Sequence, residues 1–264
     1  MFNIFDKLHD SRLLLDYSVR KNITFKNEYD NVVILNDYSG YPDVRIKRLE
    51  KFSYLCDRNV IYSACSSNVS SLKILCLSSS GIPYEDNRVL DFANAFFDVI
   101  LITNNVGQDF GGYFSGMDFI KYNKIHSSTI TLLNTSQFYS NNHISSLIEI
   151  SLPLNCFLGL SFGIGPRFKF IKFLHIQSYF LKFHFNDAFK VFDTLIPDRR
   201  FYCSKYNIIE HGEVKLSKLC MNNNLTPLIA FKGKLIKLDY KTSIMHEDFR
   251  ANIFTDGAQY LTLT

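Results

Sequence analysis

The sequence predicts an α/β protein with a mostly parallel, doubly wound sheet. Short apolar runs alternate with longer amphipathic stretches, and each apolar run in the first half ends in small polar residues. The chain has 264 residues, of which 47% are hydrophobic and 20% are charged, so it can bury one large core. Alternation of this kind is typical of crossover connections, which bring strands together in parallel.

Four apolar runs in the first half are predicted to be strands, and three stretches between them have helical spacing or composition. The strands are expected at Asn31 to Leu35, Leu72 to Leu77, Phe97 to Thr103 and Ser128 to Leu133, and the helices at Val44 to Tyr54, Asp86 to Ala95 and Gly112 to Tyr122. In doubly wound sheets, ligands bind outside the carboxyl ends of the strands. We therefore expect the polar residues after each strand to line one crevice.

The pattern changes beyond residue 140, where one apolar stretch carries glycines and helical periodicity dominates. Helices are expected at Asn141 to Ile150, Leu174 to Phe183, Asp187 to Leu195 and Asn207 to Asn222, a strand or tight loop at Cys156 to Ile164, and strands or a partner-facing arm after Lys232. The sequence contains no internal repeat and no low-complexity linker. We expect a single domain over residues 1–264.

The distribution of charge argues against nucleic-acid binding. The net charge is only +4, and basic and acidic residues interleave instead of forming a stripe. The exception is the stretch from Arg167 to Lys182, where basic residues lie among apolar ones without an acid. This stretch is either a surface for anionic lipid headgroups or a buried element whose lysines extend toward solvent.

The cysteines and the apolar runs indicate a protein of the reducing cytoplasm. The six cysteines form no CxxC pair. The first residues lack the basic-then-apolar build of a secretion signal, and no apolar run reaches the roughly 20 residues of a membrane span. We expect a cytoplasmic location, with peripheral contact at the inner face of the plasma membrane as an option.

The stretch from Thr103 to Gly116, TNNVGQDFGGYFSG, is the most informative part of the sequence. Its glycines allow the backbone to approach a ligand closely, and its Asn, Gln and Asp side chains supply hydrogen-bonding groups at a strand end. It has neither the GK[ST] of a phosphate-binding loop nor the GxGxxG of a dinucleotide fold. The alternative is an ordinary turn before a glycine-rich helix.

Four segments, in order along the chain, carry a family resemblance. They are Asn105-Val-Gly107-Gln-Asp109, Leu132-Leu-Asn134-Thr-Ser136, His175-Ile-Gln177-Ser178-Tyr179-Phe180, and Ile209-Glu210 followed by Val214 to Leu219. They resemble four motifs of the rhamnan-synthesis F family of bacterial polysaccharide glycosyltransferases. The first segment resembles its NxGxD signature, and the second its strand ending in Asn-Asp-Ser. The third resembles its His-Leu-Gln-Ser-Tyr-Phe block, and the fourth its Tyr-Glu helix. The resemblance covers roughly residues 30–230.

The resemblance implies a GT-A-like fold, with a nucleotide-sugar-binding half at about 30–140 and an acceptor-binding half and tail at about 141–264. It also implies inverting transfer of rhamnose or another hexose from a dTDP- or UDP-linked nucleotide sugar to a lipid-linked O-antigen or capsule oligosaccharide. One alternative is a catalytically silent GT-A-like scaffold in a polysaccharide-assembly complex. A nucleotidyltransferase is disfavoured, because the stretch from Asn36 to Gly40 offers no basic residue after the first strand.

Metal dependence is left open by the resemblance. GT-A enzymes often hold the donor diphosphate through a divalent metal on a DxD-type motif at a strand end. The matching residues here, Asn134-Thr135-Ser136, carry no carboxylate, and hard divalent cations prefer carboxylate oxygens. We therefore predict no metal ligand and keep Mg²⁺ or Mn²⁺ as an open alternative. Without a metal, basic side chains, backbone N–H groups or helix ends must meet the charge of the leaving group.

Asp109 is the first candidate for the base that deprotonates the acceptor hydroxyl, because it lies in the expected crevice. Binding of donor-sugar hydroxyls is its equally open alternative role. His175 and Glu210 are the reserve candidates for the base, although His175 and Gln177 could instead cap and rigidify a helix in the core. The acceptor-binding candidates are Gln177, Ser178 and Tyr179.

The donor-binding candidates follow the strands of the first half. Each has an ordinary structural alternative, since Asn-Asp-Tyr-Ser-Gly after the first strand is also a common turn sequence. The candidates are Asn36, Asp37, Ser39, Ser79, Asn105, Gly107, Gln108, Asn134 and Ser136.

Overall fold

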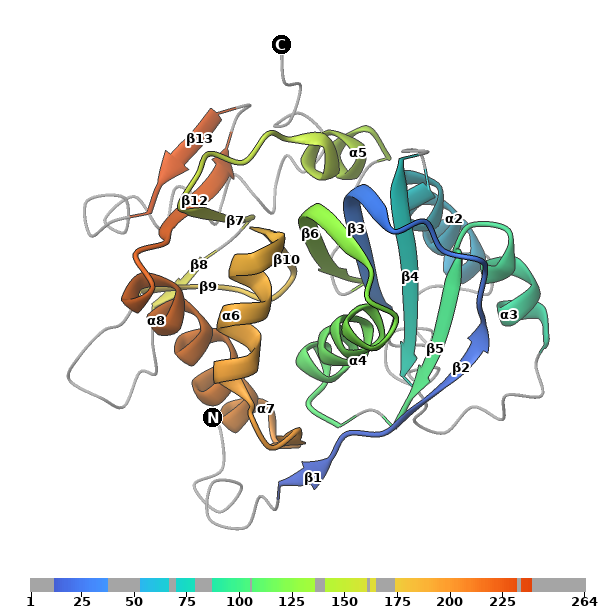
Figure 1. Ribbon diagram of the computed structural model, residues 1–264, viewed down its shortest axis with the longest axis horizontal. Coiled ribbons are helices and arrows are strands. Elements are labelled where there is room, and N and C mark those ends of the chain that lie inside the picture. The colour runs from blue at the N-terminus through green and yellow to red at the C-terminus, as the bar shows by residue number, and fades with distance from the viewer. Residues whose placement is uncertain are drawn as a thin grey trace.

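The computed structural model describes residues 12–37, 53–66, 70–78, 87–104, 106–135, 141–160, 162–164, 174–231 and 234–238. The described chain is built around a mixed sheet of nine strands in the order β13-β12-β7-β10-β6-β3-β4-β5-β2. Two small two-stranded sheets, β1-β11 and β8-β9, lie beside it. Figure 1 shows the first half of the chain on the right of this sheet and the second half on the left.

The centre of the sheet consists of four parallel strands in the spatial order β6-β3-β4-β5. They are β3 (Glu28–Asp37), β4 (Ser71–Ser78), β5 (Val99–Thr103) and β6 (His126–Asn134). All four were predicted from their apolar runs, and the prediction of a parallel core is confirmed. Three of the four extend further than the apolar runs, because polar residues at their ends still pair with neighbouring strands.

The outer strands make the sheet mixed. Antiparallel pairing joins β2 to β5, β10 to both β6 and β7, and β13 to β12, whereas β12 is parallel to β7. Their bounds, with those of the two small sheets, are β1 (Leu13–Leu14), β2 (Tyr17–Lys21), β7 (Cys156–Gly159), β8 (Phe162–Ile164), β9 (Leu174–Ile176), β10 (Phe180–His184), β11 (Arg200–Phe201), β12 (Thr226–Phe231) and β13 (Lys234–Lys237).

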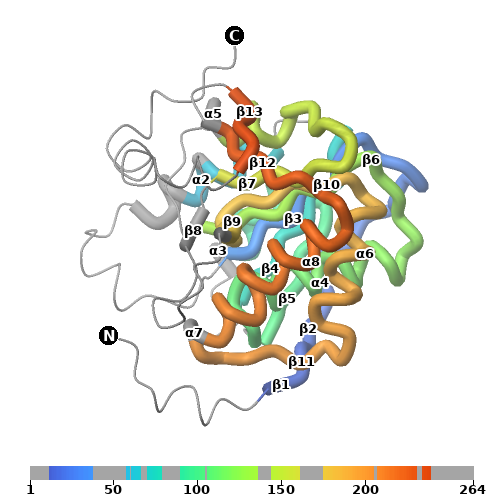
Figure 2. Tube along the Cα trace, turned by 90° about the vertical axis from the view of Figure 1, so that its left-hand side faces the viewer, coloured from blue at the N-terminus to red at the C-terminus, as the bar shows by residue number. Residues whose placement is uncertain are grey.

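Helices cover both faces of the sheet. On one face, α4, α6 and α8 pack on a core that includes Ile34 and Phe192; on the other, α2, α3 and α5 pack on a core that includes Leu35 and Tyr62. Figure 2 shows α2 to one side of the strands and α4 and α6 to the other. The helices are α2 (Ser53–Ser66), α3 (Asn87–Asn94), α4 (Asp109–Tyr122), α5 (Asn141–Glu149), α6 (Phe185–Leu195), α7 (Lys205–Ile208), the π-helix η1 (Ile209–Val214) and α8 (Lys215–Asn222).

The helix predicted over Leu174 to Phe183 is wrong, since this stretch forms β9 and β10. Strand β10 lies between β6 and β7, and four of its five residues are buried. A strand covered on both faces has a continuous apolar run, which periodicity alone does not distinguish from a buried helix. The error therefore comes from burial on both faces of the sheet.

Lys182 in β10 corrects the interpretation of the basic stretch. Its ammonium is buried and donates hydrogen bonds to the carbonyl oxygens of Ile148 and Ile150. Burial lowers the pKa of Lys182 to about 8. This lysine neither contacts a lipid surface nor extends into solvent; the other basic residues of the stretch lie outside the described residues.

Other predicted elements differ mainly in their boundaries. Most of the helix predicted at Val44 to Tyr54 lies outside the described residues, and the observed α2 begins at Ser53 and continues to Ser66. The glycine-bearing stretch from Cys156 to Ile164 contributes β7 and β8. Within the described chain, no helix is long and apolar enough to cross a membrane.

Candidate functional site

Buried polar residues meet at the carboxyl ends of the four parallel strands. Asn36 pairs in register with Asn134 on one side and with Cys76 on the other, and Ser78 pairs with Thr103. Asn36, Ser78, Thr103 and Asn134 are all almost fully buried. The expected convergence of these strand ends is therefore observed, but at these positions the polar side chains lie within the protein.

A chain of hydrogen bonds runs across these strand ends to α4. The Thr103 hydroxyl donates to Ser78 Oγ over 3.4 Å, and the Ser78 hydroxyl donates to Asn36 Oδ1 over 3.3 Å. The Asn36 amide in turn donates to Asp109 Oδ1 over 3.3 Å. Buried polar groups need such partners, and this chain fixes the orientation of the Asn36 amide toward Asp109.

The glycines at the start of α4 let this helix approach the strand ends. A Cβ at Gly112 would lie 2.0 Å from Asn36 Oδ1, closer than any contact allows. Gly107 has φ +76°, and a Cβ there would lie 2.5 Å from the Phe201 ring. These glycines let the backbone lie close to the Phe201 and Asn36 side chains, and their predicted approach to a ligand stays a prediction.

Asp109 lies in the first turn of α4, where it is enclosed by polar groups and partly exposed. Besides Asn36, it contacts Ser178, whose hydroxyl lies 3.1 Å from Asp109 Oδ2. Removal from water, partly offset by the hydrogen bond from Ser178 and reinforced by the negative charge of Glu213, raises the pKa of Asp109 from 3.8 to about 6. Asp109 is thus a stronger base than an exposed aspartate.

Ser178 connects Asp109 to Glu213, a residue that sequence reasoning missed. The backbone N–H of Ser178 donates to Glu213 Oε1 over 2.8 Å, and its hydroxyl lies 2.8 Å from the same oxygen. One hydroxyl proton cannot serve Asp109 and Glu213 together. At any moment the Ser178 hydroxyl therefore donates to one of the two carboxylates, and the other receives no proton from it.

Glu213 could have been noticed from helical spacing. It precedes the buried Leu216 by three residues and the buried Cys220 by seven, so a helix over Asn207 to Asn222 puts a carboxylate on its apolar face. The predicted reserve, Glu210, lies in η1 and is partly exposed, whereas Glu213 is buried. A buried carboxylate among apolar neighbours calls for a specific partner.

The second reserve base, His175, belongs to the same cluster. It is buried in β9, and its Nε2 lies 3.6 Å from Glu213 Oε2. Residues Gln177 and Tyr179 flank Ser178 in the turn from β9 to β10, and both are partly exposed. The Tyr113 hydroxyl donates to the carbonyl of Ser178 over 2.7 Å and holds this turn against α4. The cluster of Asp109, His175, Ser178 and Glu213 is called the carboxylate cluster below.

Asp37, the neighbour of Asn36, has a different environment. Its carboxylate is fully buried and accepts hydrogen bonds from Arg58 Nε at 2.6 Å, the Tyr62 hydroxyl at 2.7 Å and the Thr135 hydroxyl at 3.0 Å. The guanidinium neutralises its charge. The described contacts of Asp37 therefore hold α2 and the end of β6 to β3, instead of presenting a carboxylate to a ligand.

The described residues do not fit a divalent cation at the end of β6. The Asn134 side chain is buried, the Thr135 hydroxyl is used on Asp37, and Asp37 is already paired with Arg58. Among the residues that the structure describes, no group of three or more His, Cys, Asp and Glu side chains is placed to hold a metal. Four candidates lie outside the described residues: Ser39, Ser79, Asn105 and Ser136.

Comparisons with known proteins do not assign a family. No protein-family profile matches the chain. The uncharacterized protein y4gN of Sinorhizobium fredii (strain NBRC 101917 / NGR234) is 27% identical over 150 residues, which are 52% of this chain and 35% of that protein. The chain thus spans about a third of this curated relative.

Among solved structures, the apo-form glycosyltransferase GlyE of Streptococcus pneumoniae TIGR4 is similar with a TM-score of 0.43 and 14% sequence identity. The alignment covers 89% of this chain and 54% of that chain.

Proposed function

We propose that this chain is a glycosyltransferase that moves a hexose from a nucleotide-diphosphate sugar to a glycan hydroxyl, with Asp109 as the base. The observation that carries the proposal is the position of Asp109: a partly exposed carboxylate with a pKa of about 6 beside the carboxyl ends of four parallel strands. Ligands of such sheets bind at this edge, and perturbed carboxylates are concentrated at functional sites.

The chemistry follows from the state of Asp109. At neutral pH a carboxyl with a pKa of about 6 is mostly ionised, yet it accepts a proton more readily than an ordinary aspartate. In the proposed step, Asp109 takes the proton of the acceptor hydroxyl, the hydroxyl oxygen bonds to the anomeric carbon, and the bond from that carbon to the diphosphate breaks. The product is inverted at the anomeric carbon.

The neighbours of Asp109 hold it for this role. Asn36 donates to one carboxylate oxygen, and Ser178 contacts the other while its own position is fixed by Glu213. The negative charge of Glu213 contributes to the raised pKa of Asp109. Glu213 is therefore proposed as a positioning residue, with Ser178 at one of its carboxylate oxygens and His175 at the other.

The resemblance to the rhamnan-synthesis F family supports the finer part of the proposal. We assign the donor to the dTDP- or UDP-linked hexoses, including rhamnose, and the acceptor to lipid-linked O-antigen or capsule glycans at the inner face of the membrane. Gln177 and Tyr179 are proposed to contact the acceptor, because they are partly exposed on either side of Ser178. Gly107 and Gln108 at the start of α4 are proposed to approach the donor. No step is assigned to a metal ion.

The test is sugar transfer by the purified chain. A panel of dTDP-, UDP- and GDP-sugars is incubated with lipid-linked acceptors, and release of the nucleoside diphosphate is measured. Asp109→Asn should lower kcat by about a thousandfold, within the range for loss of a general base. In the wild type, kcat/KM should rise through about pH 6 and then level off, as the pKa of Asp109 requires.

Ser115→Ala is the matched control, since Ser115 lies in the same helix and its hydroxyl donates to the Gly111 carbonyl. It should keep nearly full activity. Full activity in Asp109→Asn would remove Asp109 from the mechanism. If the wild type bound no nucleotide sugar and released no diphosphate, the chain would be a silent scaffold, a function that the neutralised Asp37 and the missing carboxylate at Asn134 would then favour.

A further inference from the structure

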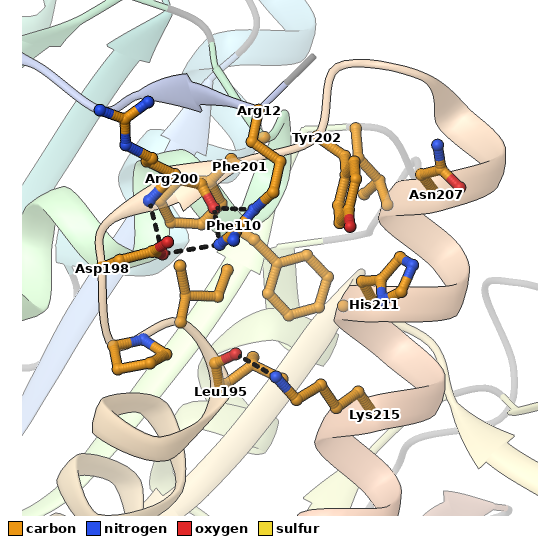
Figure 3. A pocket seen from close by; sticks show the side chains of 15 residues that line it. Arg12, Phe110, Leu195, Asp198, Arg200, Phe201, Tyr202, Asn207, His211 and Lys215 are labelled. Atoms are coloured by element: carbon orange, nitrogen blue, oxygen red, sulfur yellow. Dashed lines mark hydrogen bonds and ion pairs between the residues drawn. The ribbon is translucent and has the colours of Figure 1, made fainter. Parts of the chain in front are cut away.

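A cavity of about 270 Å³ is lined in part by Phe110 and Gly212 and by no residue of the carboxylate cluster. It is enclosed by the start of α4, the segment that joins α6 to β11, and the continuous helix α7-η1-α8 (Figure 3). The cavity and the carboxylate cluster are built by adjacent residues of the chain, since Phe110 follows Asp109 and Gly212 precedes Glu213. Of the residues proposed above for the transfer reaction, Gly107 is the one that also lines this cavity.

The charged groups around the cavity are predominantly positive. Arg12 and Lys215 bring cationic groups to it, against a single carboxylate, that of Asp198, whereas Figure 3 shows the Arg200 guanidinium directed away from both. Arg12 is held in place, because its Nη2 lies 2.6 Å from Asp198 Oδ1 and its Nε donates to the Arg200 carbonyl over 3.1 Å. The guanidinium therefore has a fixed position beside the cavity, and Asp198 matches part of its charge.

Lys215 supplies a positive charge that the described residues leave uncompensated. Its ammonium is half-buried and donates to the carbonyl oxygen of Leu195 over 2.7 Å. Within the described ranges of the chain, no carboxylate lies within ion-pair distance of Lys215. An ammonium group has three protons to donate, so two remain for another acceptor in the cavity (Figure 3).

The rest of the lining suits a compact ring with hydroxyl groups. Phe110, Leu195 and Ile196 form apolar surface, and Figure 3 shows the Phe110 ring between Arg12 and Lys215. On the other wall, the rings of Tyr202 and His211 are stacked with centroids 4.5 Å apart. The Tyr202 hydroxyl, the His211 ring and the Asn207 amide add groups that can donate or accept hydrogen bonds.

We propose that this cavity binds the phosphate-bearing unit of a phosphorylated sugar, with the phosphate between Arg12 and Lys215. The sugar ring then lies over Phe110, with its hydroxyls toward Tyr202 and Asn207. A small concave site with an apolar floor and a few converging polar groups is typical of small-molecule binding. Cations without a full complement of carboxylates select an anionic ligand.

The test is calorimetry on the full chain with three probes: glucose 1-phosphate, inorganic phosphate and glucose. Glucose 1-phosphate should bind, inorganic phosphate should bind more weakly, and glucose should not bind. Lys215→Met keeps most of the apolar stem and removes the charge, so it should weaken binding of glucose 1-phosphate by about tenfold or more. Lys215→Arg should retain binding.

Lys218→Met is the matched control, because Lys218 is exposed on the same helix and does not line the cavity. It should bind glucose 1-phosphate as the wild type does. Equal affinities of Lys215→Met and Lys218→Met would overturn the proposal, as would no binding of glucose 1-phosphate to the wild type at about 10 mM. If Lys215→Met does not fold, Arg12→Gln replaces it with the same expected loss.

Two sources of the ligand are separated by a transfer assay. If the phosphosugar is part of the acceptor glycan, glucose 1-phosphate should compete with the acceptor and raise its KM. If it is a separate small molecule, the KM for the acceptor should not change. The binding measurement itself requires no transfer, so it stands even if the chain proves to have no glycosyltransferase activity.

Discussion

Asp37 follows Asn36 in β3, and Asp109 accepts a hydrogen bond from the Asn36 amide. The two carboxylates nevertheless have contrasting environments. Asp37 receives three short hydrogen bonds, one of them from a guanidinium, and is fully buried. Asp109 receives hydrogen bonds from the amides of Asn36 and Asn134 and shares one hydroxyl with Glu213. The first carboxylate is neutralised and joins three elements, whereas the second keeps an incompletely compensated charge near solvent.

This contrast distinguishes a carboxylate that joins elements of the fold from one that is proposed to act as a base, at the same sheet edge. The Asp37 carboxylate is already used by Arg58, Tyr62 and Thr135, so it serves to join elements of the fold. Asp109, which is removed from water and lies near the Glu213 carboxylate, has instead a pKa raised to about 6, and such groups are concentrated at functional sites. The three predictions below test the two halves of this comparison, in order of decreasing effect.

Removing the Arg58 guanidinium should destabilise the protein, because Asp37 would then be a buried charge without a counter-ion. Arg58→Met leaves the Asp37 carboxylate with only neutral donors, so we expect the free energy of unfolding to fall by about 3 kcal/mol. Urea denaturation at pH 7.5 measures this change. A change in the free energy of unfolding below about 0.5 kcal/mol would count as no effect. The double variant Arg58→Met/Asp37→Asn should recover part of the loss, because it removes the unpaired charge. No recovery in the double variant would show that Arg58 acts by packing alone.

A methyl group at Gly112 should disturb the link between the strand ends and Asp109. The Cβ would overlap Asn36 Oδ1 and push away the amide that bonds to both Ser78 and Asp109. We expect Gly112→Ala to destabilise the protein by about 2 kcal/mol, despite the better helix propensity of alanine. Thermal unfolding compares it with Ser115→Ala, which adds no atoms to the same helix. Equal melting temperatures would mean that α4 shifts freely relative to β3.

Neutralising Asp109 should stabilise the protein, and only above its pKa. The folded state binds the proton of Asp109 more tightly than the unfolded chain does, since the pKa rises from 3.8 to about 6 on folding. The stability of the wild type therefore falls as the pH rises from about 4 to about 6, and the penalty persists at higher pH. Asp109→Asn should add about 1–2 kcal/mol to the free energy of unfolding at pH 8, a value reduced for partial exposure.

The same variant should gain little at pH 4, where much of Asp109 is already protonated in the folded protein. Urea denaturation at the two pH values gives the difference. A gain of the same size at both pH values would assign the effect to something other than the charge of Asp109. A loss at pH 8 would contradict the incomplete compensation that distinguishes Asp109 from Asp37.

The sequence by itself determined the parallel core and the residues at its edge. Buried parallel strands are short apolar runs, and polar side chains that follow such runs must meet where the strand ends meet. For that reason β3, β4, β5 and β6 were predicted at the right places, with Asn36, Asp109 and Asn134 at their ends, whereas Ser178 was predicted from the family resemblance. The glycines of α4 were also informative, although their described neighbours at Gly107 and Gly112 are protein side chains.

Only the tertiary structure decided which carboxylate is neutralised and which elements pair across long separations. Asp37 and Asp109 look alike in sequence, and their difference comes from Arg58 and Glu213, which lie 21 and 104 residues away. Strand β10 looked helical because it is buried on both faces, a property set by β6 and β7. Local patterns report the periodicity of one element, but charge balance and burial depend on partners that folding brings from elsewhere in the chain.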